Sequence, residues 1–139
     1  IFIIMTDFFN GLVEISNRLL NKYFIDIYDL MEIDIFYNLL QIIDKSHFWI
    51  VENGGAWNNM KKQIDGYLAK HGFELKLDLN QDLIIKNDID SMVTLLCKIF
   101  SFLEVFWENE WRKVTKDLSS ADQKIVNIVG KLAQDLLET

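Results

Sequence analysis

The side chains best suited to metal binding or nucleophilic catalysis are scarce in this chain. His47 and His71 are its only histidines, and Cys97 is its only cysteine. None of the three has a second such residue at the short spacing of a zinc site. We expect each histidine to interact with a helix end, and Cys97, in an apolar run, to be a small buried hydrophobic residue. The sequence therefore predicts neither a metal site nor a cofactor.

Pairs of acidic residues are the next candidates for chemistry, for example Asp26 with Asp29 and Glu108 with Glu110. General acid and base catalysis needs opposed carboxyl groups with separated pKa values in a cleft, and closeness in sequence does not supply this. The GxSxG, P-loop, GxGxxG and HExxH patterns are absent. We expect the acidic pairs to be solvated surface, and we predict that the protein is not an enzyme.

Two tryptophans flank a turn in the stretch "HFWIVENGGAWNNMKK". Asn53, Gly54 and Gly55 allow positive φ angles and a sharp chain reversal at little steric cost. The turn would let Trp49 and Trp57 bury together. Aromatic side chains beside a turn are also typical of binding sites, so both tryptophans are candidate interface residues.

Part of the same stretch, "WIVENGGAW", resembles the second homology motif of the B-cell lymphoma family of apoptosis regulators. The motif combines Trp-Ile, Glu-Asn-Gly-Gly and Trp, and here Ala56 is inserted before Trp57. The resemblance implies a helical apoptosis-regulator-like protein as one alternative. The context departs from the family pattern, because a long segment follows the motif and the most apolar helix follows it instead of preceding it.

The strongest helical pattern is "IDSMVTLLCKIFSFLEVFWENEWRKV", residues 89–114. At 100° per residue its apolar side chains form two adjacent stripes, one ending at Trp111 and the other containing Phe102 and Phe106. A helix this widely apolar is either central in a bundle or shared with a partner. We predict a homodimer through Phe102 and Phe106, and we add Trp111 to the candidate interface.

The remaining pattern predicts further helices and one pair of strands. We expect helices to begin at Thr6 or Asp7, at Asp34, at Ala56, at Asn87 or Asp88, and at Ser119 or Ser120. Gly72 is placed as a left-handed C-terminal cap. Apolar residues alternate with charged ones in "FELKLDL", which predicts a β-hairpin over residues 73–86. The fold class is thus mainly α: one domain, residues 1–139, with four to six helices in a bundle and one hairpin.

The charge and composition of the chain indicate what kind of protein it is and what kind of partner it would bind. Half of the 139 residues are hydrophobic and the net charge is -7, which predicts a globular protein that does not bind nucleic acid directly. We expect no secretory signal, no membrane span and a cytoplasmic location. The preferred function is a small acidic module that binds a basic protein, as an inhibitor, immunity protein or antitoxin does. The alternatives are an enzyme or small-ligand binder with a pocket between helices, and a structural oligomer.

Overall fold

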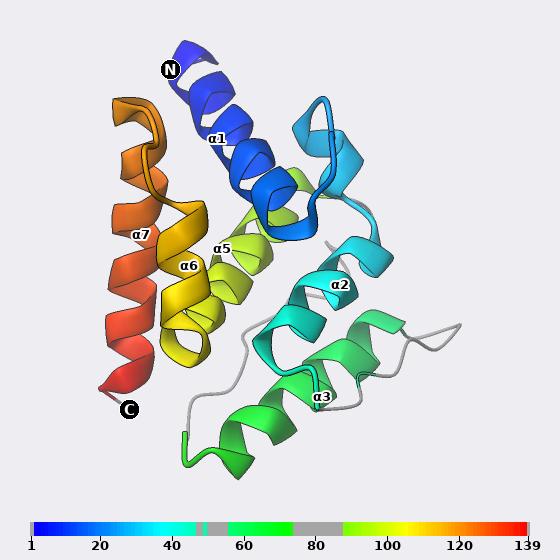
Figure 1. Cartoon of the computed structure of the whole chain (residues 1–139). Coiled ribbons are helices and arrows are strands. Elements are labelled where there is room, and N and C mark those ends of the chain that lie inside the picture. The colour runs from blue at the N-terminus through cyan, green and yellow to red at the C-terminus, as the bar shows by residue number, and fades with distance from the viewer. Residues whose placement is uncertain (1, 47–48, 50–55, 74–87, 139) are drawn as a thin grey trace.

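The structure, a computed structural model, describes residues 2–46, 49, 56–73 and 88–138 (Figure 1). The chain is mainly helical, as the sequence predicts, and no strand occurs among these described residues. No helix in them combines the length and the apolar character needed to cross a lipid bilayer. The elements in chain order are α1 (Phe2–Leu20), the 3-10 helix η1 (Ile27–Leu30), α2 (Ile33–Ile43), α3 (Ala56–Lys70), α5 (Ile89–Phe106), α6 (Glu108–Val114) and α7 (Ser120–Leu137).

Several helix ends confirm the predicted caps. The Asp88 side chain accepts a hydrogen bond from the backbone N–H of Ser91 at the start of α5. Ser119 does the same for Asp122 at the start of α7. These bonds satisfy backbone donors that have no partner inside the helix. Two starts differ from the prediction: α1 begins at Phe2, ahead of Thr6, and α2 begins at Ile33, so that Asp34 lies inside its first turn.

Gly72 ends α3 in the predicted left-handed conformation, with φ +84°. The Gly72 N–H donates to the Ala69 carbonyl at 3.1 Å, and the Phe73 N–H donates to the Leu68 carbonyl at 2.9 Å. This pair of bonds is the Schellman motif. The predicted hairpin was to begin at Phe73, which instead completes this cap. The rest of the hairpin, residues 74–86, lies outside the described residues.

The long helix predicted over residues 89–114 is interrupted at Trp107. There the backbone leaves the helical region (φ −140°, ψ 52°), α5 ends at Phe106 and α6 begins at Glu108. The break lets α6 pack back on α5, and the Trp111 ring lies 5.4 Å from that of Phe100. Apolar periodicity did not reveal the break because apolar residues are buried on both sides of it.

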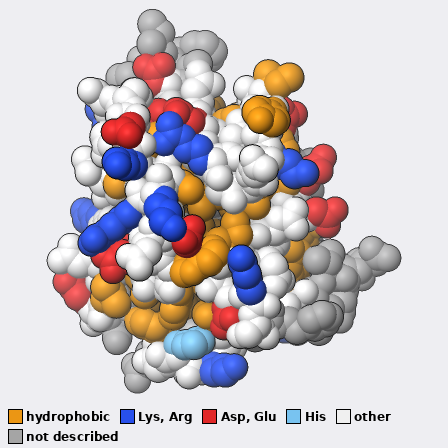
Figure 2. Space-filling view, viewed as in Figure 1, with side chains coloured by type: hydrophobic (Ala, Val, Ile, Leu, Met, Phe, Trp, Pro, Cys, Tyr) orange, Lys and Arg blue, Asp and Glu red, His pale blue; other side chains and the backbone are white. Residues whose placement is uncertain are grey.

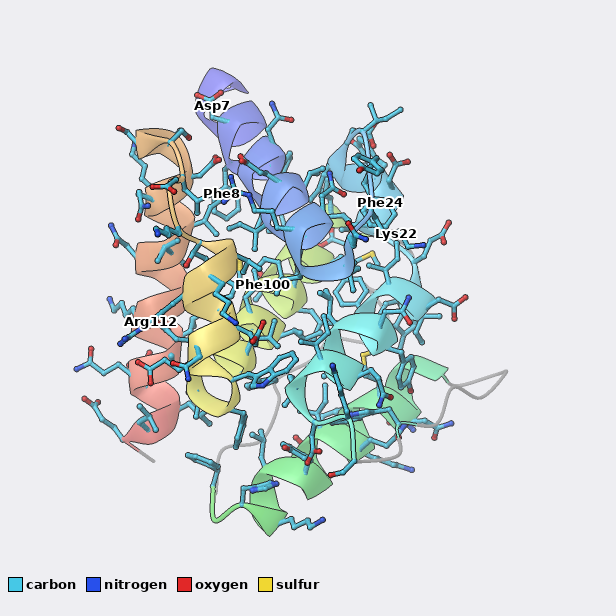
Figure 3. All side chains as sticks on the ribbon, in the orientation of Figure 1. Asp7, Phe8, Lys22, Phe24, Phe100 and Arg112 are labelled. Carbon is cyan, nitrogen blue, oxygen red and sulfur yellow. The ribbon has the colours of Figure 1, made fainter. Side chains whose placement is uncertain are left out.

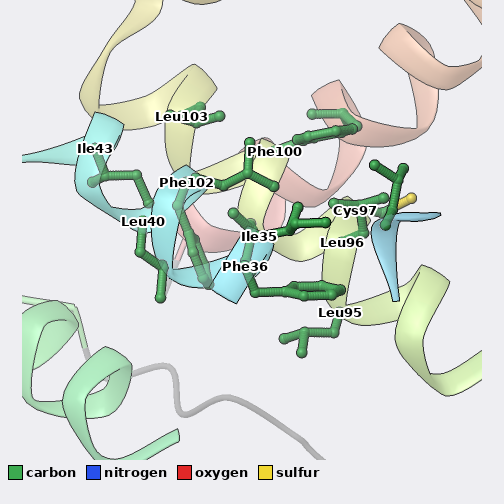
Figure 4. Packing of buried hydrophobic residues seen from close by; sticks show 14 of the residues in the cluster. Ile35, Phe36, Leu40, Ile43, Leu95, Leu96, Cys97, Phe100, Phe102 and Leu103 are labelled. Carbon is green, nitrogen blue, oxygen red and sulfur yellow. The ribbon is translucent and has the colours of Figure 1, made fainter. Parts of the chain in front are cut away.

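Helix α5 is the centre of the fold, packing against α2, α6 and α7, and α1 packs on α7 (Figure 1). Figure 4 shows Phe36 and Leu40 of α2 among side chains of α5. Both predicted stripes of α5 are covered within the chain, and Phe102 on the second stripe is buried at 4% exposure. The fold confirms the central position of this helix in a bundle, and its sharing with a partner stays a prediction.

Candidate functional site

Three large hydrophobic side chains project into solvent from one short segment. Tyr23 is 93% exposed, Ile25 86% and Tyr28 71%. They lie in the connection between α1 and η1 and in the first residues of η1, and residues 23–28 are here called the 23–28 loop. Figure 2 shows hydrophobic atoms at this corner of the molecule, and Figure 3 labels Phe24 and Lys22, where the chain leaves α1. Scattered apolar residues are normal on a surface, but three gathered on one loop are a candidate binding site.

The beginning of the loop is held by Asn17, one turn before the end of α1. Its side-chain amide donates to the Phe24 carbonyl at 3.1 Å and accepts from the Phe24 N–H at 2.8 Å. Its backbone carbonyl accepts from the Lys22 N–H at 3.1 Å, while Asn21 takes the left-handed conformation with φ 55°. Asparagine tolerates that conformation better than most residues. The chain therefore leaves α1 along a fixed path.

The end of the loop is held by a capping box around η1. Asp26 accepts from the backbone N–H groups of Tyr28 and Asp29, at 3.0 and 3.3 Å. Asp29 accepts in return from the N–H groups of Ile25 and Asp26, at 2.9 and 3.2 Å. Four backbone donors are thus satisfied by two carboxylates. This acidic pair, considered above for catalysis, is a structural cap on an exposed turn.

Apolar residues on the inner side anchor the same segment. Ile27 is 3% exposed and Leu30 fully buried, and Phe24 packs against the core while partly buried. Residues at positions 24, 27 and 30 therefore face inward, while those at 23, 25 and 28 face outward. Burial in the core and hydrogen bonds at both ends hold the backbone of the loop, which lowers the backbone entropy that binding would have to remove.

A cleft of about 470 Å³ lies beside the loop. Tyr23 and Ile25 line it together with Lys22, Asn21 and polar residues of α1, namely Asn10, Glu14, Asn17 and Arg18, and with Val13. The site thus combines a projecting apolar loop with a recess that offers amide, carboxylate and cationic groups. Apolar and polar groups occur together in protein–protein interfaces as well.

The charged residues in the wall of this cleft connect three helices. Arg18 forms an ion pair with Glu14 at 2.8 Å and donates to the backbone carbonyls of Val114 and Lys116, both at 2.9 Å. A side-chain hydrogen bond with Asp122 raises the pKa of Glu14, helped by burial and by the charge of Asp122, while Arg18 opposes the shift. The wall is therefore braced against the end of α6 and the start of α7.

The other residues considered for catalysis or metal binding are found in ion pairs, in a ring contact or in the core, where the structure describes them. Glu108 pairs with Arg112 and Glu110 with Lys113 on the surface of α6. His71 lies exposed at the end of α3, with its ring 4.4 Å from that of Tyr67, and His47 lies outside the described residues. Cys97 is buried as predicted, and burial raises the pKa of its thiol to about 12. No group of three metal-binding side chains occurs in the described part of the chain.

The five predicted interface residues contribute to the interior. Phe102, Trp49 and Trp111 are buried, and Phe106 and Trp57 are partly buried against the core. Phe106 contacts Tyr67 edge-on at 5.3 Å, and Trp57 contacts Phe36 edge-on at 5.4 Å. Homodimerisation stays a prediction, but buried Phe102 offers no surface to a second copy. The structure does not bring these five residues together into an exposed site.

The stretch "FIDIYDLMEID", which includes most of the loop, belongs to none of the sites that the sequence predicts. Its signal was the spacing of Phe24, Ile27 and Leu30, which repeats every third residue and leaves Tyr23 and Tyr28 on the other side. A one-turn 3-10 helix has this spacing, because it has three residues per turn. Such a turn is too short to stand out against the longer apolar patterns on either side.

The flanks of the "WIVENGGAW" turn are described, although residues 50–55 are not. Trp49 is 7% exposed, and its ring lies 5.4 Å from that of Tyr67.

No family model, curated protein or solved structure matches this chain.

Proposed function

We propose that this protein is a small acidic binding module that acts through the 23–28 loop on a basic partner protein, in the manner of an inhibitor, immunity protein or antitoxin. The observation that carries the proposal is the exposure of Tyr23, Ile25 and Tyr28 on a segment held at both ends by hydrogen bonds. Tyrosine is among the residues that contribute most to binding energy at protein interfaces.

The charge of the surrounding segment supports a basic partner. Asp26, Asp29, Glu32 and Asp34 are all exposed, and Lys22 is the only cation between positions 22 and 34. The whole chain carries a net charge of -7. This charge would steer a basic protein toward the loop, while the three apolar side chains would supply the desolvated contact.

The test uses photo-crosslinking in the source cells, followed by affinity measurement with the protein that is captured. A photoreactive residue at position 25 should crosslink a basic protein, and one at Leu137, an exposed hydrophobic residue on α7, should not. With the purified partner, Tyr23→Ala together with Tyr28→Ala should weaken binding by about 30-fold or more, since a single interface tyrosine can contribute about 2 kcal/mol.

The matched control is Leu137→Ala, which removes a similar exposed apolar side chain elsewhere and should leave affinity unchanged. Affinity should also fall as salt is raised, because the complex pairs opposite charges. An acidic partner, or a double variant that binds as well as the wild type, would overturn the proposal.

A further inference from the structure

A second concave site lies away from the 23–28 loop, where α1, α5 and α7 meet. It is a groove of about 710 Å³, within the range of small-ligand pockets. Its apolar lining comes from all three helices: Phe8 and Phe9 of α1, Val93 and Cys97 of α5, and Ala121, Ile128 and Leu132 of α7. From Ala121 to Leu132 the lining follows α7 for about 16 Å at 1.5 Å per residue, so the groove is elongated.

Between its charged residues, the groove lining offers a ligand no strong hydrogen-bond donor, and the exposed Thr94 oxygen is its one side-chain oxygen acceptor. The Thr94 hydroxyl already donates to the Asp90 carbonyl at 2.7 Å, and a cysteine thiol is a weak donor. Polar atoms buried there would lose their hydrogen bonds to water without replacement, which is unfavourable. The body of a ligand must therefore be apolar, and the length of the groove along α7 suits an unbranched chain.

The charged residues that line the groove indicate which charge the head group of a ligand would carry. Asp7 and Asp90 are exposed, and neither forms an ion pair within the described residues. Asp90 is not needed to cap α5, because Asp88 does so. Lys124 is the single opposing charge in the lining. Two free carboxylates against one ammonium group, on a chain of net charge -7, favour a positively charged head.

We propose that this groove binds a cationic amphiphile, a free small molecule with one alkyl chain and a positively charged head group. The chain lies along α7 over Val93, Ile128 and Leu132, and the head lies beside Asp7 and Asp90. This site is independent of the 23–28 loop, so the two can be tested separately.

The test is isothermal titration calorimetry on the full chain, with probes kept below their critical micelle concentrations. Dodecyltrimethylammonium should bind at one site and about three- to tenfold more tightly than neutral dodecyl maltoside, with dodecanoate weaker still. Tetramethylammonium, which has the head without the chain, should not bind measurably.

Variants locate the site. Asp90→Asn should weaken dodecyltrimethylammonium binding by about two- to fivefold and leave dodecyl maltoside unchanged, while Asp135→Asn, an exposed acid on α7 outside the groove, should change neither. Ile128→Ser should weaken both probes, whereas Leu137→Ser should not. Tightest binding of dodecanoate, equal effects of the two aspartate variants, or no binding of any probe would overturn the proposal.

Discussion

Helices α1 and α7 are in close contact at Gly11, and adding one methyl group there is a sharp test of the packing. A Cβ atom at Gly11 would lie 2.3 Å from Ile125 Cδ1 and 2.5 Å from Asp122 Oδ1. Both neighbours are buried, Ile125 completely and Asp122 at 6% exposure, so neither can swing into solvent. Gly11→Ala should therefore separate the two helices or displace both side chains.

The expected magnitude follows from a matched pair of substitutions. Gly66, in α3, has nothing within 4 Å of the position that its Cβ would take. Gly66→Ala should stabilise the protein by up to about 1 kcal/mol, because alanine is the better helix former. Gly11→Ala brings the same gain in helix propensity, but overpacking should lower its unfolding free energy by about 1–3 kcal/mol. Since the propensity gain cancels, the difference between the two variants measures the steric contact alone.

The assay is urea unfolding at 25 °C, followed by far-ultraviolet circular dichroism. We expect Gly66→Ala to raise the midpoint above the wild type, and Gly11→Ala to lie about 1–3 kcal/mol below Gly66→Ala in unfolding free energy. Equal unfolding free energies for the two variants would show that α1 and α7 are not in close contact at Gly11.

Three further predictions concern single side chains. The raised pKa of Glu14 means that its contribution to stability is complete below about pH 4.5 and is lost as the pH rises through its folded pKa. The stability of the wild type relative to Glu14→Gln should therefore fall as the pH rises above about 4.5, and a constant difference in urea midpoint would contradict this. Cys97, with a thiol pKa of about 12, should resist iodoacetamide at pH 8 in the folded protein and react in guanidinium chloride, and rapid alkylation without denaturant would refute its burial. Gly72→Val should lower unfolding free energy by about 1–2 kcal/mol, because a β-branched residue is strained at φ +84°, and an unchanged midpoint would argue against the left-handed cap.

The sequence by itself determined the helical class and several helix ends. Gly72, Asp88 and Ser119 could be placed because a cap depends on residues within one turn of it. The burial of Cys97 could be predicted from its position in an apolar run. These features rest on local interactions, which are the ones that periodicity and residue type record.

Only the tertiary structure decided which apolar residues remain exposed. Phe102 and Tyr23 are both large and aromatic, yet Phe102 is 4% exposed beneath neighbouring helices and Tyr23 is 93% exposed. The break at Trp107 likewise depends on the packing of Trp111 against Phe100. A hydrophobic pattern shows that a side chain favours burial, but whether it is covered depends on elements distant in the sequence. For that reason the 23–28 loop and the groove of α1, α5 and α7 became visible only in the folded chain.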